Sequence, residues 1–468
     1  MKSKIFGVVI TLIVLVSLTV IPAFAAPAGR WITDFTLYNL SNTDANISIT
    51  RYNGFTTGGA TDTGTNVKSD TIAHNGSLYY NPANDPNFPS GFNGSIVVSS
   101  SQPVAGTVTV ANDLTGSGYA SDAYSAVASP APTQYLPIIM GKYSVWNTRI
   151  SIQNAGNAST PAPADVTIHY VGAGAPPDDT IKGLPLNQTF QLDQYTNANM
   201  NNFNGSAVVS STNGQNLAVV VEEYRTTGGM LVMYNGTSQA DTTVYIPGYI
   251  NQGAWNTDFT IVNTTGNNAN VTINFTGGTQ VKGVVPGNNS VYINNALPDS
   301  SWSGTFPSAA GSGYYGAATI TSTQNIVVAY NIANTARGGA GNLGIGYLGF
   351  PSSQASTSVV VPLIENVYST GWGTTFSVQS VEGTPANLSM AYSGNKTPLC
   401  NPCTYNMGAN ESAHTFVQGA NDHVPAGFIG GVSITSDKPI VVIADQNNIV
   451  SPSYRLGDAA AGFIGFDQ

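Results

Sequence analysis

The chain has 468 residues, of which only 8% are charged, and its formal net charge is −10 at pH 7. A sparsely charged, acidic surface repels phosphate backbones and anionic lipid head groups, which argues against nucleic acid and against an anionic membrane surface as partners. The polar surface must therefore consist mainly of Asn, Ser, Thr and Gly, and the net charge serves solubility more than recognition.

Residues 1–25 have the pattern of a secretory signal peptide. Lys2 and Lys4 precede an apolar run over residues 5–21, and Ala23-Phe24-Ala25 is a small-x-small cleavage site. The run is short for a bilayer span, which disfavours the alternative of an uncleaved anchor. We expect a mature chain that starts at Ala26, carries a formal charge of −12 and is exported to the cell surface or the medium without further membrane insertion.

The pattern of the remaining residues indicates four copies of one module. A phrase of Trp-x-Thr followed by alternating apolar residues begins at Trp31, Trp146, Trp255 and Trp372. The alternation has the two-residue period of a strand that is buried on one face, which places one buried core tryptophan in each module. The expected boundaries are 26–130, 131–240, 241–354 and 355–468.

Three further phrases recur in every module: an Ala-x-apolar-x-apolar strand, an Asn-x-Ser/Thr turn, and a strand with a glycine two residues after an aromatic ring. The glycines are Gly94, Gly205, Gly316 and Gly430. A glycine inside a strand marks a bulge or a close backbone approach, and here the ring could cover the bare backbone. In modules 2 to 4 a strand too apolar to have a solvated face follows, and it should lie in the centre of its sheet.

Short strands separated by Gly, Asn and Pro turns, without a helical period, predict an all-β fold of four tandem antiparallel β-sandwiches in an elongated array. A β-propeller is disfavoured because propeller blades repeat at roughly 40–50 residues. The tryptophans here are 109 to 117 residues apart.

Proline-containing connectors, with Pro137, Pro247 and Pro362, stand eight to ten residues before the tryptophan of modules 2 to 4. Module 1 has no counterpart after cleavage at Ala26. If each connector pairs with the module that follows it, the edge of module 1 could accept a strand from another molecule, and chains could self-associate. The alternative is a first module that is merely shorter.

With its Trp-x-Thr, Ala-Asn-apolar and Phe-x-Gly-Ser strands, the module resembles the immunoglobulin-like repeats of secreted and surface proteins of bacteria. The resemblance covers nearly all of the mature chain and implies an extracellular, non-enzymatic, tandem β-sandwich protein. Three of the four modules contain no cysteine. The core disulfide of true immunoglobulin domains is therefore missing, and antibody-type recognition does not carry over.

The chain has two cysteines, Cys400 and Cys403, in the sequence Cys-Asn-Pro-Cys. Redox exchange normally needs a βαβ context, and a metal site would need further ligands. We expect a disulfide that staples a long loop in module 4, as an oxidising compartment favours. The sequence predicts no metal and no cofactor.

No group of residues has the spacing of a catalytic centre, so we expect no catalytic residues. Glu222-Glu223 is the best carboxylate pair for glycoside hydrolysis, but neighbours on a strand point to opposite faces. We interpret the pair as ordinary surface charge at a strand end. A Gly-x-Ser-x-Gly elbow is absent, and the histidines, which share no metal-ligand spacing, are interpreted as surface residues: His74, His169, His414 and His423.

Each turn phrase is also a glycosylation sequon, at Asn75, Asn187, Asn288 and Asn410. The left-handed backbone that a tight turn demands is an alternative explanation for the same residues.

An insertion that only module 3 has, with Trp302 and Phe306, is the best candidate for a ligand contact. We expect a secreted or cell-surface structural or adhesive protein, an elongated spacer that binds surface polysaccharide or another surface protein through module faces or loops. An extracellular carbohydrate-binding accessory protein is the alternative, and a hydrolase is the least favoured.

Overall fold

The computed structural model describes residues 10–14, 30–114, 118–127, 129–157, 159–226, 229–307, 313–334, 343–368, 371–409, 411–418, 423–448 and 457–467. Apart from residues 10–14, the expected signal peptide lies outside these ranges, as does Asn410. The described elements are strands and two 3-10 helices, η1 (Pro82–Asn84) and η2 (Ser352–Gln354), which confirms an all-β fold. Within these ranges, no helix has the length and apolar character needed to cross a bilayer.

Module 2 consists of two separate four-stranded antiparallel sheets. We call β13-β10-β15-β16 its axial sheet and β12-β11-β14-β9 its connector sheet. Ile150 and Val219 of the first sheet pack with Val166 of the second in one buried cluster, so the two sheets enclose a core. The strands are β9 (Thr133–Gly141), β10 (Trp146–Gly156), β11 (Ala164–Val171), β12 (Asp179–Leu184), β13 (Thr189–Asp193), β14 (Phe203–Ser211), β15 (Asn216–Arg225) and β16 (Leu231–Asn235).

The strand order of the axial sheet recurs in the other modules as β5-β2-β7-β8, β21-β18-β23-β24 and β30-β27-β31-β32. In modules 3 and 4 one long strand, β23 or β31, runs through both the axial and the connector sheet. The strands of module 1 are β2 (Arg30–Asn39), β3 (Ala45–Asn53), β4 (Thr65–Ile72), β5 (Ser77–Tyr80), β6 (Gly94–Ser100), β7 (Val104–Leu114) and β8 (Gly118–Ser125).

The remaining strands belong to modules 3 and 4. Those of module 3 are β17 (Asp241–Gln252), β18 (Trp255–Asn263), β19 (Ala269–Phe275), β20 (Gln280–Val285), β21 (Ser290–Asn294), β22 (Ser303–Gly304), β23 (Tyr314–Asn334), β24 (Leu343–Leu348) and β25 (Phe350–Pro351). Those of module 4 are β26 (Ser356–Asn366), β27 (Trp372–Ser380), β28 (Asn387–Gly394), β29 (Cys403–Asn406), β30 (Ala413–Val417), β31 (Phe428–Asn448), β32 (Gly457–Ile464) and β33 (Phe466–Asp467).

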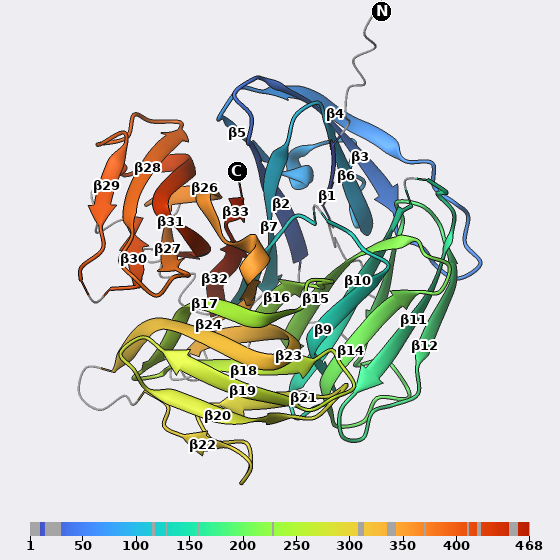
Figure 1. The fold of residues 1–468 in the computed structure, drawn as a ribbon. Helices are drawn as coiled ribbons and strands as arrows, with labels where there is room; N and C mark the ends of the chain where they lie inside the picture. Colours follow the sequence, from blue (N-terminus) through green and yellow to red (C-terminus); the bar gives the residue numbers. More distant parts are fainter. Residues whose placement is uncertain are drawn as a thin grey trace, which may run out of the picture.

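The four modules form a closed ring and not the elongated array that the sequence suggested (Figure 1). The last strand of each axial sheet, which we call its inner strand, lies at the centre; these are β8, β16, β24 and β32. The ring closes where β32 of module 4 pairs in parallel with β8 of module 1.

The apolar central strands explain why the modules associate. Strand β15 lies between β10 and β16, as expected for a strand without a solvated face. Its Val219 packs in the core of module 2, whereas its Val220 packs in the cluster that centres on module 1. Burial of both faces therefore requires a neighbouring module, and a rod with short connectors would leave one of these faces in water.

One strand lies in the expected signal peptide. Strand β1 (Ile10–Val14) pairs antiparallel with β6 at the edge of the connector sheet of module 1. In modules 2, 3 and 4 the connector strands β9, β17 and β26 occupy the corresponding position, next to β14, β23 and β31.

Candidate functional site

The centre of the ring is packed closely because the inner strands contain glycines. A Cβ at Gly346 would lie 2.5 Å from the carbonyl oxygen of Met233, and one at Gly462 would lie 2.8 Å from the ring of Tyr347. Contacts this short do not occur for real Cβ atoms, so the strands can approach one another only where side chains are absent.

A single carboxylate, that of Asp122 on β8, lies at the point where the four inner strands meet. Its Oδ1 accepts hydrogen bonds from the backbone N–H of Ala123 (2.8 Å) and of Gly462 (2.6 Å), and its Oδ2 from those of Met233 (2.5 Å) and Gly346 (3.2 Å). Each module supplies one donor. The four donors hold equivalent places, three residues before an N–H that bonds to the central strand of the axial sheet.

Asp122 is fully buried, and burial raises the pKa of its carboxyl. The four backbone N–H groups oppose that rise, because a carboxylate accepts hydrogen bonds and all four partners are donors. The site therefore resembles an anion-binding cradle whose anion is part of the protein, and its role is to hold the ring together.

A cavity of about 370 Å³ opens at one end of this centre, where the inner strands finish. Ser125, Asn235, Leu348 and Ile464, one from each inner strand, line it and also line a pocket of about 30 Å³ on its central side, room for roughly one water molecule. The segments that follow the inner strands complete the wall, with side chains that carry amides and hydroxyls: Ser129, Gln134, Thr237, Ser238, Gln239, Ser353 and Gln354. We call this space the axial cavity.

Two residues that line the axial cavity, Gln134 and Asn235, each have a buried amide oxygen with no hydrogen-bond partner among the described residues. Gln134 is 1% exposed; its Nε2 donates to the carbonyl of Leu217 at 2.9 Å, which leaves Oε1 unpartnered. Asn235 donates from Nδ2 to the carbonyl of Ser125 at 2.7 Å, which leaves Oδ1 unpartnered. Buried polar atoms are nearly always hydrogen-bonded, so each of these oxygens retains the capacity to accept a hydrogen bond from a water or a ligand.

The two residues expected to contact a ligand are buried instead. Trp302 is 3% exposed and Phe306 is 9% exposed, and both belong to the core of module 3. The indole of Trp302 covers Gly283, where a Cβ would collide with the ring. The insertion therefore folds back over β20 as part of the core, and the prediction of a projecting binding loop was wrong.

The four repeated tryptophans differ in burial. Trp31 is buried in the cluster shared by modules 1 and 2, with the guanidinium of Arg149 lying 5.6 Å from its ring centre. Trp146, Trp255 and Trp372 are only half-buried, because each lies at the start of its strand. The threonine two places on is buried in every module, as are the apolar residues that follow it; the threonines are Thr33, Thr148, Thr257 and Thr374.

The repeated strand glycines lie beneath the aromatic ring two residues earlier. A Cβ at Gly94, Gly205 or Gly430 would be 2.7–2.9 Å from the ring of Phe92, Phe203 or Phe428, and one at Gly316 would be 2.5 Å from the hydroxyl of Tyr314. Atoms of the neighbouring strand lie closer still, such as the carbonyl oxygen of Tyr52 beside a Cβ at Gly94. This agrees with the close backbone approach that the phrase suggested.

Glu222 and Glu223 are not surface charges, because they are 1% and 0% exposed. Glu222 accepts from the guanidinium of Arg149 at 2.9 Å, and Glu223 accepts from Asn331 of module 3 at 3.0 Å. Their strand is buried on both faces by the ring, so each carboxylate needs an internal partner. As adjacent strand residues they face different partners and cannot act together on one substrate.

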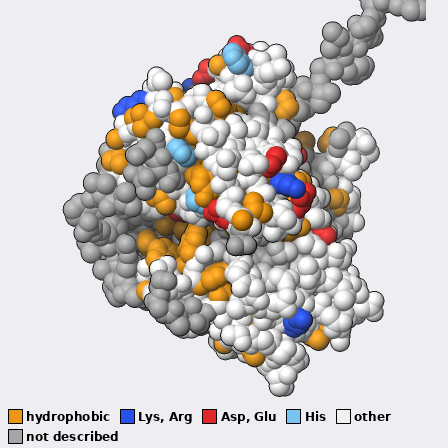
Figure 2. Space-filling view, turned by 60° about the vertical axis from the view of Figure 1, so that its left-hand side comes forward, with side chains coloured by type: hydrophobic (Ala, Val, Ile, Leu, Met, Phe, Trp, Pro, Cys, Tyr) orange, Lys and Arg blue, Asp and Glu red, His pale blue; other side chains and the backbone are white. Residues whose placement is uncertain are grey.

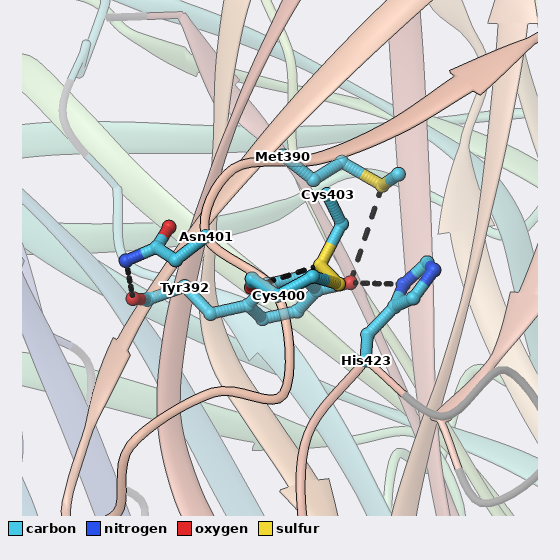
Figure 3. Close-up of a disulfide and its surroundings, with 6 residues drawn as sticks. All are labelled: Met390, Tyr392, Cys400, Asn401, Cys403 and His423. Atoms are coloured by element: carbon cyan, nitrogen blue, oxygen red, sulfur yellow. Dashed lines mark hydrogen bonds between the residues drawn. A yellow bond between two sulfur atoms is a disulfide. The ribbon is translucent and has the colours of Figure 1, made fainter.

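The disulfide between Cys400 and Cys403 is present, with Cα atoms 5.1 Å apart (Figure 3). It joins the loop after β28 to the start of β29. The ligand atoms of both cysteines and of His423 lie within 4.8 Å of one another, a group that could hold a metal ion if the sulfurs were free. His423 Nδ1 is 3.0 Å from the hydroxyl of Tyr392. Because the sulfurs are bonded to each other, the cluster stabilises the loop in this state.

Two of the histidines are exposed and three turn asparagines have the turn conformation, as the sequence predicted. His74 and His169 are exposed and lie beside Asp44 and Asp178, whereas His414 is partly buried beside Glu411. Asn75, Asn187 and Asn288 have left-handed backbones, with φ of 52°, 63° and 49°, as turn chemistry requires.

Comparisons with known proteins add little to this picture. No protein-family model and no curated protein matches the chain. A glycoside hydrolase of family 32 from Bifidobacterium adolescentis is a weak structural match, with 7% identity, coverage of 92% of this chain and 99% of that one, and a TM-score of 0.16. A TM-score this low supports no statement about fold or activity.

Sequence reasoning missed Asp122, Gln134 and Asn235. One available signal was the distribution of apolar residues. A segment that is apolar on both faces, such as 217–221, needs a second layer of structure to cover it. Nothing in the local sequence around Asp122 distinguishes it from a surface aspartate, because its donors come from strands as many as 340 residues away.

Proposed function

We propose that the protein is an exported, non-enzymatic binding protein whose axial cavity holds a neutral, polyhydroxylated ligand such as the end of a glycan chain. The observation that carries the proposal is that two residues lining the axial cavity, Gln134 and Asn235, each have an amide oxygen without a hydrogen-bond partner among the described residues. Each requires a hydrogen-bond donor, and a sugar offers several hydroxyl donors at close spacing.

The remaining chemistry of the axial cavity fits the same ligand class. Its wall combines hydroxyls and amides with the aromatic ring of Phe466, and Asp467 contributes the carboxylate among the lining residues. Figure 2 shows that Lys, Arg, Asp and Glu also cover little of the outer face in view. The lining residues that the structure describes include no Lys or Arg, and apolar side chains such as Val127 and Leu348 stand between the polar groups. Such a wall favours hydroxyl groups over phosphate groups.

The carboxylates argue against hydrolysis of such a ligand. Glycoside hydrolysis normally uses two carboxyl groups facing one bond. Asp122, Glu222 and Glu223 are buried and hydrogen-bonded within the protein, away from the axial cavity wall. We therefore infer a binding role at the cell surface or in the medium, with surface polysaccharide or a glycan-bearing surface protein as partner. The ring replaces the elongated spacer in this interpretation.

A glycan array followed by titration calorimetry with the best glycan tests the proposal, and Gln134→Met is the informative variant. Gln153 provides a matched control, because its Nε2 also donates to a backbone carbonyl (of Asn187, 2.9 Å) and its Oε1 is also unpartnered. Gln153 does not line the axial cavity.

We expect Gln134→Met to weaken glycan binding by about tenfold, as the loss of a hydrogen bond to a buried group would, and Gln153→Met to leave it unchanged. Equal effects of the two substitutions, or no glycan bound, would disprove the assignment of the cavity. Release of new reducing ends from the bound glycan would disprove the non-enzymatic role.

A further inference from the structure

The connector strands complete modules 2, 3 and 4 in the same way. Strands β9, β17 and β26 pair antiparallel with β14, β23 and β31 in the connector sheet, and β17 and β26 pair on their other side with the two-residue strands β25 and β33. At equivalent positions Leu136 pairs with Ala207, Ile246 pairs with Ala318 and Val361 pairs with Val432. A proline follows each of these connector residues, where the strand register shifts.

Each connector also donates one hydrogen bond to the buried threonine of the Trp-x-Thr phrase. The backbone N–H of Met140 donates to Oγ1 of Thr148 at 2.8 Å. Ile250 donates to Thr257 at 2.8 Å, and Glu365 donates to Thr374 at 2.9 Å. The donor stands three residues after the connector proline in all three modules.

Among the described residues, module 1 has the acceptor but no donor to it. Thr33 is 0% exposed, and its Oγ1 has no hydrogen-bond partner within the described ranges. A buried hydroxyl without a partner is unusual and destabilising. The arrangement that satisfies it elsewhere in this chain is a connector strand, so Thr33 indicates a strand position that is incompletely filled.

Strand β1 shows where that strand belongs. Val14 pairs with Ile96, two residues after Gly94, just as Leu136 pairs with Ala207, two residues after Gly205. β1 therefore has the position and direction of the first half of a connector, and it ends where the connector proline would follow. The N–H that would reach Thr33 lies four residues further along such a strand.

We propose that, once residues 1–25 are removed, the edge of β6 is an acceptor for an extended strand from a partner protein. This inference rests on the proposed export with cleavage before Ala26. The chain's own connectors are not available as donors to a second copy, since Leu136, Ile246 and Val361 are each fully buried in their own modules.

The three internal connectors define the chemistry of the partner strand. It pairs its backbone with Ile96–Ser100, places an apolar side chain opposite Ile96, continues with proline and donates an N–H to Thr33 Oγ1 three residues later. This is β-augmentation at a sheet edge: backbone pairing supplies affinity, and the threonine and the apolar position supply specificity. The nonapeptide Thr-Gln-Tyr-Leu-Pro-Ile-Ile-Met-Gly, identical to Thr133–Gly141, is the natural probe.

The experiment is fluorescence anisotropy of this labelled peptide with the chain that begins at Ala26. We expect saturable one-to-one binding that a scrambled peptide does not show. Thr33→Val removes the acceptor without a change of shape and should weaken binding about fivefold or more. Thr148→Val is the matched control, because the edge of module 2 is already occupied, and peptide affinity should not change.

No binding of the connector peptide, or equal binding by the Thr33→Val variant, would overturn the proposal. N-terminal sequencing of the exported protein separates the two levels of inference. A chain that still begins at Met1 would refute both the cleavage and the open edge. A chain that begins at Ala26 and does not bind the peptide would refute only the proposal that β6 accepts a strand.

Discussion

Asp122 Oδ1 accepts a hydrogen bond of 2.6 Å from the backbone N–H of Gly462, a residue 340 positions away in the last module. With the three other donors to the same carboxylate, this bond ties the inner strands of all four modules to one side chain. A charge that is fully buried is tolerated when donors surround it, and here backbone N–H groups supply them. The ring is thus closed by polar as well as apolar contacts.

Asp122→Asn should destabilise the protein strongly. The amide keeps the size of the carboxylate but turns an NH₂ group toward backbone N–H groups that need an acceptor. We expect the free energy of unfolding to fall by about 3 kcal/mol or more, measured by urea unfolding at pH 7. Asp178→Asn, at an exposed ion pair with His169, should change it by less than about 1 kcal/mol. Similar effects of the two substitutions would contradict the role of Asp122.

Gly462→Ala should disturb the same centre by overpacking. The new methyl group would lie 2.8 Å from the ring of Tyr347 and still closer to Ile345, in a region where no strand can move outward without opening the ring. We expect a loss of about 1–3 kcal/mol in thermal or urea unfolding. Gly373→Ala is the control, because no atom lies within 4 Å of its added Cβ. An unaffected Gly462→Ala variant would show that the inner strands are loosely packed.

The closed ring makes a prediction about shape. A compact chain of about 440 residues has a radius of gyration of roughly 22 Å, whereas four sandwiches in a row would give a markedly larger value. Small-angle X-ray scattering of the chain that begins at Ala26 should give the compact value and a single-peaked distance distribution. A distance distribution with a long tail would instead support the elongated arrangement of four sandwiches.

Glu365 should make stability depend on pH. Burial raises the pKa of its carboxyl from the ordinary 4.5 to about 7, against the hydrogen bond from Gln446. The folded state therefore holds the proton more tightly than the unfolded state. Its contribution to stability is complete below about pH 4.5 and is lost as the pH rises through 7, a total of roughly 3 kcal/mol.

Glu365→Gln has no proton to lose, so this variant should be more stable than the wild type at pH 8 and should show a flatter dependence between pH 5 and pH 8. Urea unfolding at the two pH values measures both quantities. An unchanged slope in the variant would mean that other buried carboxylates, such as Asp258 with a pKa raised to about 6 by burial, dominate the dependence.

Local patterns in the sequence predicted local structure well, and long-range contacts explain what they missed. Alternation and turn residues were enough for strands such as β10 and for the left-handed turn at Asn187, because both depend on neighbours in sequence. The burial of Trp302 and of Glu223 depends on elements that alternation does not encode: a loop that folds back on its own module and a strand of the next module. The role of Asp122 and the axial cavity could not be predicted from local sequence for the same reason, since every module contributes to them.

The threonine of the Trp-x-Thr phrase offers a final check that needs no ligand. Thr148→Val leaves the N–H of Met140 buried without an acceptor, and we expect a loss of about 1–3 kcal/mol in urea unfolding. Thr33→Val removes a hydroxyl that has no partner, so the same substitution should be neutral or stabilising in the chain that begins at Ala26. Equal losses at the two positions would show that Thr33 is already satisfied, and that module 1 is complete without a partner strand.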